Sequence, residues 1–200
     1  FQDGLRLMHH TCTFAHEAFR SVRAPFAAEL GLTPDQVTAL IAENCREAEV
    51  TDVSGPRVMI ASGRRRDLAG LLEGAEAEGC LHAKLPPVSM PFHSSLLGQV
   101  EGRIRDFLGQ IEVRRPACGI VSCVSQKVLD CEEDVREEAA GNVSHPIHWL
   151  NTMGRLLALG VDTFVECGLS DSLCNLARNI DGDYQMYHPR KFHKLFASLS

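Results

Sequence analysis

The order of strand-like and helix-like segments between residues 25 and 85 constrains the fold more than any other feature of the sequence. Short apolar runs typical of strands flank two segments whose apolar residues recur at helical spacing. Thr33 as N-cap, Pro34 at the first helical position and Gln36 two residues later mark the first helix start. The expected strands are 26–32, 48–53, 57–62 and 81–85. The order is β-α-β-β-α-β, as in ferredoxin-like domains.

Outside this region, the patterns predict an α/β layer. Expected helices cover residues 4–20, 94–111, 132–140 and 148–159, and the first is apolar over a wide arc, which favours burial with Thr11 facing inward. The continuous apolar run at 117–124 is typical of a buried parallel strand, and residues 161–166 are expected to form a further buried strand. A helix after Asp171 and another from Pro189 complete the expected elements.

Charge and composition exclude several classes of partner. The net charge of −6 and pI near 5.8 give no overall attraction to nucleic acid or to an anionic membrane surface. No apolar run is long enough to span a membrane, and no signal peptide opens the chain. The start, Phe1-Gln2-Asp3-Gly4, lacks Met and is typical of the middle of a longer chain.

The eight cysteines contain no C-x-x-C pair and are scattered through apolar segments, a pattern that favours reduced core cysteines and a cytoplasmic protein. A zinc site remains the alternative, using Cys118, Cys123 and Cys131 or the pair His145 and His148. Because these spacings fit no common zinc pattern, we expect no metal.

His93 is the candidate proton carrier. It lies between Phe92 and two serines, after a proline-stiffened approach that contains Pro86, Pro87 and Pro91, and before a predicted helix. An imidazole can accept and return a proton near neutral pH. The alternative is a loop histidine that only caps the helix or packs.

Taken together, the motifs resemble the acyltransferase family of fatty acid and polyketide synthesis, which includes malonyl-CoA:acyl carrier protein transacylases. The resemblance covers nearly the whole chain. It rests on Phe1-x-Asp3-Gly4-Leu5-Arg6-Leu7, Gly55-Pro56-Arg57-Val58-Met59-Ile60-Ala61-Ser62-Gly63, Val88-Ser89-Met90-Pro91-Phe92-His93-Ser94, His145-Pro146-Ile147-His148-Trp149 and Gly160-Val161-x-x-Phe164-Val165-Glu166-Cys167-Gly168.

The resemblance implies an α/β-hydrolase-like large subdomain, here residues 1–24 and 88–200, with an inserted ferredoxin-like small subdomain at 25–87. It also implies a ping-pong reaction with no bound cofactor. In that reaction an acyl group passes from acyl-CoA through a serine ester to the phosphopantetheine thiol of an acyl carrier protein. His93 matches the family's catalytic base.

The family's nucleophilic serine, on a G-H-S-x-G elbow, is absent from these residues. In the family it lies upstream of the position matching Phe1, so the chain looks like the C-terminal part of an acyltransferase whose N-terminal part is a partner. Ser94 does not substitute, because it neighbours the base on the same loop.

Thr11 falls where the family has an arginine that binds the malonyl carboxylate. Threonine cannot form that bidentate, charge-assisted pair. We therefore expect a non-carboxylated, acetyl-like acyl group. If His9, His10 or His16 supplies a cation instead, a malonyl group remains the alternative substrate.

Three further positions follow from the resemblance. Asn142 matches a glutamine that supports the catalytic loop, and its amide could act in the same way. The Gly168–Ser170 segment matches a turn whose carbonyls orient the base. Phe92, with Met90 nearby, is expected to contact the acyl group and to favour small or linear chains.

A carrier protein is acidic, so the basic run Arg64, Arg65 and Arg66 is a candidate docking site, with a solvated charged face as the alternative. The tail residues Arg190, Lys191 and Lys194 are a second basic candidate. An acyl hydrolase of the same fold and a non-catalytic docking fragment remain alternative functions.

Overall fold

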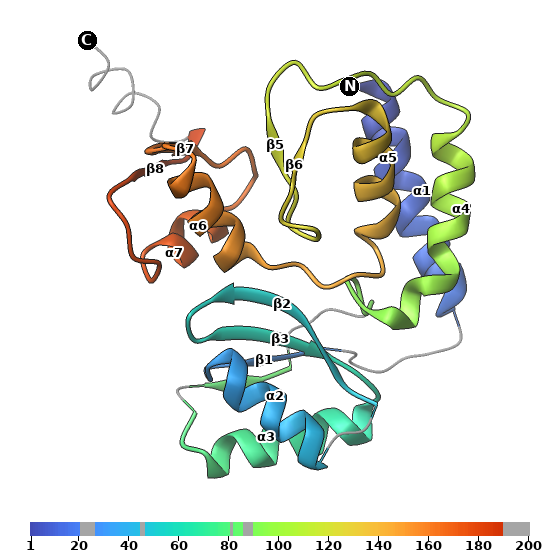
Figure 1. Cartoon of the computed structure of the whole chain (residues 1–200). Coiled ribbons are helices and arrows are strands. Elements are labelled where there is room, and N and C mark those ends of the chain that lie inside the picture. The colour runs from blue at the N-terminus through green and yellow to red at the C-terminus, as the bar shows by residue number, and fades with distance from the viewer. Residues whose placement is uncertain (21–26, 45–46, 81, 86–89, 190–200) are drawn as a thin grey trace.

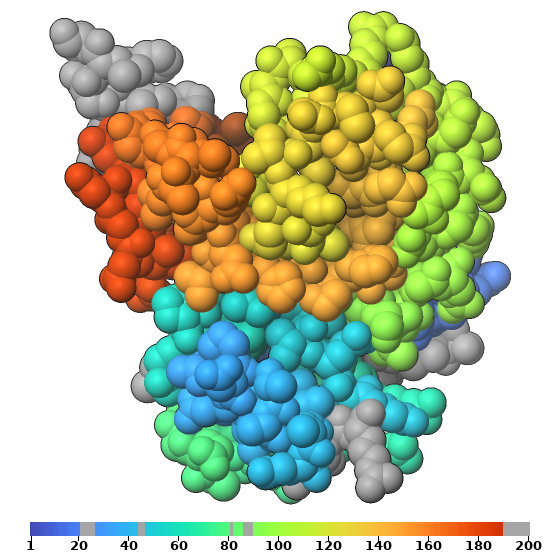
Figure 2. Space-filling model, in the orientation of Figure 1, coloured from blue at the N-terminus to red at the C-terminus, as the bar shows by residue number. Residues whose placement is uncertain are grey.

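The computed structural model describes residues 1–20, 27–44, 47–80, 82–85 and 90–189. A four-stranded sheet with two helices forms one part of the molecule, and the other helices form a second part with two short two-stranded sheets (Figure 1). The space-filling view shows the two parts in contact along β2 (Figure 2). There, the amide of Val53 donates to the Ile147 carbonyl at 3.0 Å, and the Ile147 amide donates to the Thr51 carbonyl at 3.0 Å.

The four-stranded sheet has the predicted β-α-β-β-α-β order. Its strands run β2-β3-β1-β4 across the sheet, each antiparallel to its neighbour, as in ferredoxin-like domains. The elements are β1 (Ala27–Leu30), α2 (Pro34–Asn44), β2 (Glu49–Gly55), β3 (Val58–Ser62), α3 (Arg65–Ala77) and β4 (Ala83–Lys84). The predicted strand ends at Phe26 and Leu81 lie outside the described residues.

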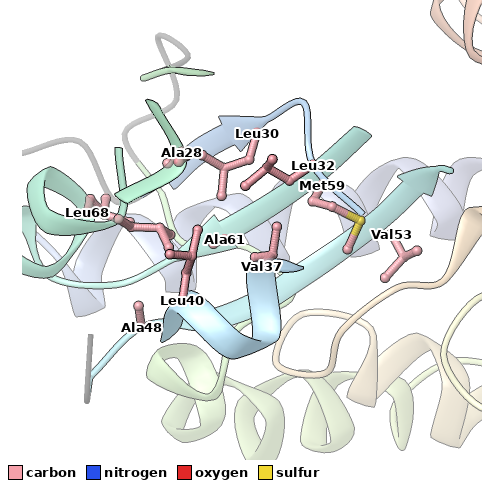
Figure 3. Close-up of a cluster of buried hydrophobic side chains, with 12 residues drawn as sticks. Ala28, Leu30, Leu32, Val37, Leu40, Ala48, Val53, Met59, Ala61 and Leu68 are labelled. Atoms are coloured by element: carbon pink, nitrogen blue, oxygen red, sulfur yellow. The ribbon is translucent and has the colours of Figure 1, made fainter. Parts of the chain in front are cut away.

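Local sequence explains these helix boundaries. Thr33 and Gln36 form a reciprocal capping box, since the Thr33 amide donates to Gln36 Oε1 at 3.1 Å and the Gln36 amide donates to Thr33 Oγ1 at 3.4 Å. Gly79, with φ of +68°, follows the end of α3. Both helices cover one face of the sheet, over a core that includes Leu30, Met59 and Leu68 (Figure 3). Each such buried side chain stabilises the fold by about 1.5–3 kcal/mol.

Strand β2 contains a β-bulge. Val50 pairs with Ala61 and Asp52 pairs with Ile60, so Thr51 is an extra residue opposite β3. The bulge changes which side chains share a face of the sheet downstream of Thr51.

Three helices pack together in the second part of the molecule (Figure 1). They are α1 (Gln2–Ala18), α4 (Gly98–Leu108), which follows the short helix η1 (Ser95–Leu97), and α5 (Glu132–Gly141). The predicted burial of α1 is wrong: Leu5 is 57% exposed and Met8 is 62% exposed. The wide apolar arc packs on α4 along only one side.

The predicted buried parallel strand at 117–124 is also wrong. β5 (Ile120–Val121) forms an antiparallel hairpin with β6 (Val128–Leu129), and Ile120 is 39% exposed. The Gln126 side chain fixes the turn by donating from Nε2 to the Cys123 carbonyl at 2.9 Å. The chain therefore reverses directly after the apolar run.

The remaining elements are α6 (Trp149–Ala158), β7 (Thr163–Val165), α7 (Ser172–Ala177) and β8 (Gln185–Tyr187). α6 ends before Gly160, whose φ is +84°, as expected. β7 was predicted as a buried strand, but Val165 is 40% exposed. Its described partner is β8, a parallel strand that the sequence did not predict.

The predicted subdomain boundaries, at 24/25 and 87/88, lie outside the described residues, as does nearly all of the predicted C-terminal helix. These boundaries and the hydrolase-like arrangement stay predictions. No helix in the described part of the chain combines the length and apolar character needed to span a membrane.

Candidate active site

His93 has an unusual backbone conformation. Its φ is +62°, in the left-handed region, although it is not a glycine. This conformation costs an L-residue about 1–2 kcal/mol. It persists only where surrounding contacts hold it, as often happens at functional sites.

The end of α5 supplies two of those contacts. The His93 amide donates to the Val143 carbonyl at 2.9 Å, and His93 Nδ1 lies 2.7 Å from the Asn142 carbonyl oxygen. A carbonyl can only accept, so Nδ1 carries the hydrogen in neutral His93, and Nε2 is the basic nitrogen. Asn142 thus meets the imidazole through its backbone, not through the side-chain amide that the sequence suggested.

An apolar cavity of about 530 Å³ lies beside His93. Of the predicted site residues, Thr11, Phe92 and Asn142 line it, whereas Met90 packs into the helical core instead. The lining is Leu7, Met8, Thr11, Cys12, Phe92, His93, Ile120, Leu129, Val135, Glu138, Ala139, Asn142 and Val143. This described lining contains no lysine or arginine.

Glu138 is the one carboxylate among those lining residues, and the sequence analysis missed it. Ser122 Oγ donates to Glu138 Oε2 at 2.5 Å, which ties α5 to the β5–β6 hairpin. Its position in the predicted helix 132–140, four residues before Asn142, was the available signal.

Two carboxylates from β2 approach the His93 loop, and both were missed. Glu49 accepts hydrogen bonds from Ser94 and Ser95. Asp52 accepts from Ser54 Oγ at 2.7 Å. Burial raises the pKa of the Asp52 carboxyl, an effect opposed by the Ser54 hydrogen bond and by the charges of His93 and His148. Two acids three residues apart in an apolar strand were the only sequence signal.

The Gly168–Ser170 turn does not orient His93 in the described contacts. The Gly168 carbonyl oxygen lies 3.0 Å from His188 Nε2, and the Leu169 side chain is 96% exposed. The orienting carbonyl comes from Asn142 instead.

The basic run at the start of α3 is partly neutralised. Arg64 and Arg66 both pair with Glu47, at 2.8 and 3.2 Å. Arg65 is exposed and has no ionic partner among the described residues. The other basic candidate, Arg190 to Lys194, lies outside the described residues.

The structure does not gather the residues considered for zinc. Within the described ranges, the only three potential metal ligands within 4.8 Å of one another are Asp130, Cys131 and Asp134. The Cys131 thiol there accepts from the Asp134 amide as a helix cap, so the cluster already has a structural role. The described cysteines are all free, and Cys45 lies outside the described part.

Comparison with solved structures defines the class: the chain has the α/β fold of acyl carrier protein transacylases. It matches an acyl-carrier-protein S-malonyltransferase from Burkholderia pseudomallei with a TM-score of 0.89 and 25% identity, covering 98% of this chain and 66% of that one. The match to a malonyl CoA-acyl carrier protein transacylase from Clostridium perfringens has the same TM-score and identity, and covers 100% of this chain and 64% of that one.

Proteins with similar sequences are transacylases of the same class. The chain is 24% identical over 184 residues to the malonyl CoA-acyl carrier protein transacylase of Bacillus subtilis, covering 90% of this chain and 58% of that protein. It is 25% identical over 189 residues to the malonyl CoA-acyl carrier protein transacylase of Staphylococcus aureus, covering 93% of this chain and 61% of that protein. The chain thus spans about three fifths of the length of these relatives. No family model matches the chain. The resemblance to the acyltransferase family of fatty acid and polyketide synthesis is confirmed.

These relatives correct one expectation. The sequence favoured an acetyl-like acyl group because Thr11 replaces an arginine, but the relatives are malonyl transacylases by name. The malonyl alternative fits them better. Thr11 is one of the residues that line the cavity.

Proposed function

We propose that the chain carries the base and the acyl cavity of an acyltransferase that moves a malonyl group from CoA to the phosphopantetheine thiol of an acyl carrier protein. The observation that supports this most is the contact between His93 Nδ1 and the Asn142 carbonyl, because it leaves Nε2 as the basic nitrogen at the cavity wall. A solved structure of similar fold, in which a malonyl-transacylase is in complex with its type II PKS acyl carrier protein, supports the choice of partner.

In this proposal His93 acts twice. Nε2 accepts the proton of the nucleophilic hydroxyl as its oxygen attacks the acyl-CoA thioester, and returns it to the departing CoA sulfur. It then accepts the proton of the pantetheine thiol and returns it to the serine oxygen. The serine itself is expected outside these 200 residues. CoA and the carrier enter as substrates, and a cytoplasmic location is part of the proposal.

The test is transfer by this chain together with the N-terminal part of the acyltransferase, which is expected to supply the serine. Malonyl-CoA and the phosphopantetheine-bearing carrier protein are added, and intact mass measures malonyl on both proteins. His93→Ala should reduce transfer by about 10²–10⁴-fold. His82→Ala is the matched control, since His82 pairs with Glu29 on the small sheet.

Other outcomes separate the alternatives. Release of free malonate without the carrier would favour the hydrolase. Absence of both transfer and hydrolysis would favour a non-catalytic docking fragment. Faster transfer of acetyl than of malonyl would contradict the proposed acyl group.

A further inference from the structure

The β-bulge in β2 places two carboxylates on one face of the small sheet. Residues three apart in a regular strand point to opposite faces. In β2, Glu49 pairs with Ser62 and Asp52 pairs with Ile60, and these β3 residues are two apart and share a face. The extra residue Thr51 therefore brings both acids to the same side.

Glu49 binds the chain directly after His93. Its Oε1 atom accepts from Ser94 Oγ at 2.9 Å, from the Ser95 amide at 2.8 Å and from Ser95 Oγ at 2.7 Å. The Ser94 side chain is fully buried. A carboxylate at this position satisfies a free amide at the start of η1 and interacts favourably with the helix dipole.

His93 is consequently held from two sides. The end of α5 binds its amide and its imidazole through Val143 and Asn142. Glu49, which belongs to the other part of the molecule, fixes the two residues that follow. Together these contacts hold a left-handed residue that would otherwise relax toward a more favourable φ.

We propose that Glu49 is a positioning residue for the base: it fixes the first turn after His93 and so couples the placement of the imidazole to the small sheet. The proposal rests on the role of His93 in the proposed acyl transfer. Glu49 is not among the residues that line the cavity, and it acts through Ser94 and Ser95.

The tautomer of His93 gives a readout that ordinary stabilisation would not change. Long-range ¹H–¹⁵N NMR of the full chain should show hydrogen on Nδ1 in the wild type, because this atom faces the Asn142 carbonyl. Glu49→Ala should yield a mixture of tautomers. Its kcat should fall about tenfold to a hundredfold, the loss typical of a misplaced catalytic group, with little change in KM for malonyl-CoA.

Conservative and control variants sharpen the test. Glu49→Gln keeps an oxygen that accepts the same bonds, so it should retain more of the Nδ1–H tautomer and of kcat than Glu49→Ala. Glu112→Ala removes an exposed carboxylate that pairs with Arg114 in a distant loop, and should match the wild type.

A wild-type tautomer and wild-type kcat in Glu49→Ala would overturn the proposal. If that variant fails to fold, Ser95→Ala supplies the readout, because it removes the bond from Ser95 Oγ to Glu49, and an unchanged Nδ1–H fraction in it would overturn the proposal equally. If the wild type itself transfers no acyl group, the proposed function fails, while the tautomer comparison still decides whether Glu49 positions His93.

Discussion

The Nδ1 atom of His93 lies 2.7 Å from the backbone carbonyl oxygen of Asn142, 49 residues further along the chain. The contact uses the main chain at the end of α5, so the side chain at position 142 need not be a glutamine for the imidazole to be held. The geometry of the helix end matters more than the identity of that side chain.

The left-handed backbone at His93 predicts a difference between two variants that both lack the imidazole. Glycine adopts a positive φ freely and alanine does not. His93→Gly should therefore be more stable than His93→Ala by about 1 kcal/mol, measured by chemical denaturation. A less stable glycine variant would show that the backbone relaxes once the ring is removed.

Replacing the buried Asp52 should stabilise the protein by an amount that depends on pH. Its folded-state pKa is raised above the ordinary value, chiefly by burial, so folding is disfavoured as pH rises from the ordinary range of an aspartate through the folded pKa. Asp52→Asn should raise the melting temperature at neutral pH, and the gain should vanish below the ordinary pKa of aspartate. The exposed Asp106→Asn serves as the control. A gain that persists unchanged into acid would contradict the burial effect.

Thr11 predicts a change in acyl preference. Thr11→Arg would place a guanidinium in the cavity wall, where a malonyl carboxylate could pair with it. We expect kcat/KM for malonyl-CoA to rise by roughly tenfold to a hundredfold relative to acetyl-CoA, the range of a hydrogen bond to a charged group. Thr13→Arg, on the same helix but absent from this cavity lining, is the control. An unchanged ratio would place the acyl carboxylate elsewhere.

The basic run at the start of α3 is expected to affect KM for the carrier protein but not KM for acyl-CoA. Changing Arg64, Arg65 and Arg66 together to glutamate should raise KM for the acidic carrier protein several-fold and leave KM for acyl-CoA unchanged, as electrostatic steering requires. The effect should shrink as salt increases. If the variant and the wild type have the same KM for the carrier protein at low salt, the carrier docks elsewhere.

The small sheet was predictable because each of its signals is local. Thr33 and Gln36, three residues apart, cap the start of α2, and Gly79 follows the end of α3. His93 could be singled out for the same reason, from the motif around it.

The hairpin, the cavity and the role of Glu49 were not predictable, because they depend on contacts between residues far apart in the sequence. The run at 117–124 has the composition of a buried strand, yet a turn held by Gln126 folds it back into a hairpin. The cavity is lined by Thr11 of α1 and by Asn142, which directly follows α5, and no spacing in the sequence predicts that the two lie together. Glu49 escaped notice because alternation assigns it and Asp52 to opposite faces, which the bulge reverses.

The bulge at Thr51 also determines how β2 would respond to the loss of one residue. Glu49 and Asp52 share a face of the sheet because Thr51, between them, has no partner in β3. Deleting Thr51 would leave the two acids two residues apart in a regular strand, which is again the same face. The loss of this one codon should therefore preserve the contact between Glu49 and the His93 loop, and its effect would fall instead on the Ile147 amide, which donates to the Thr51 carbonyl.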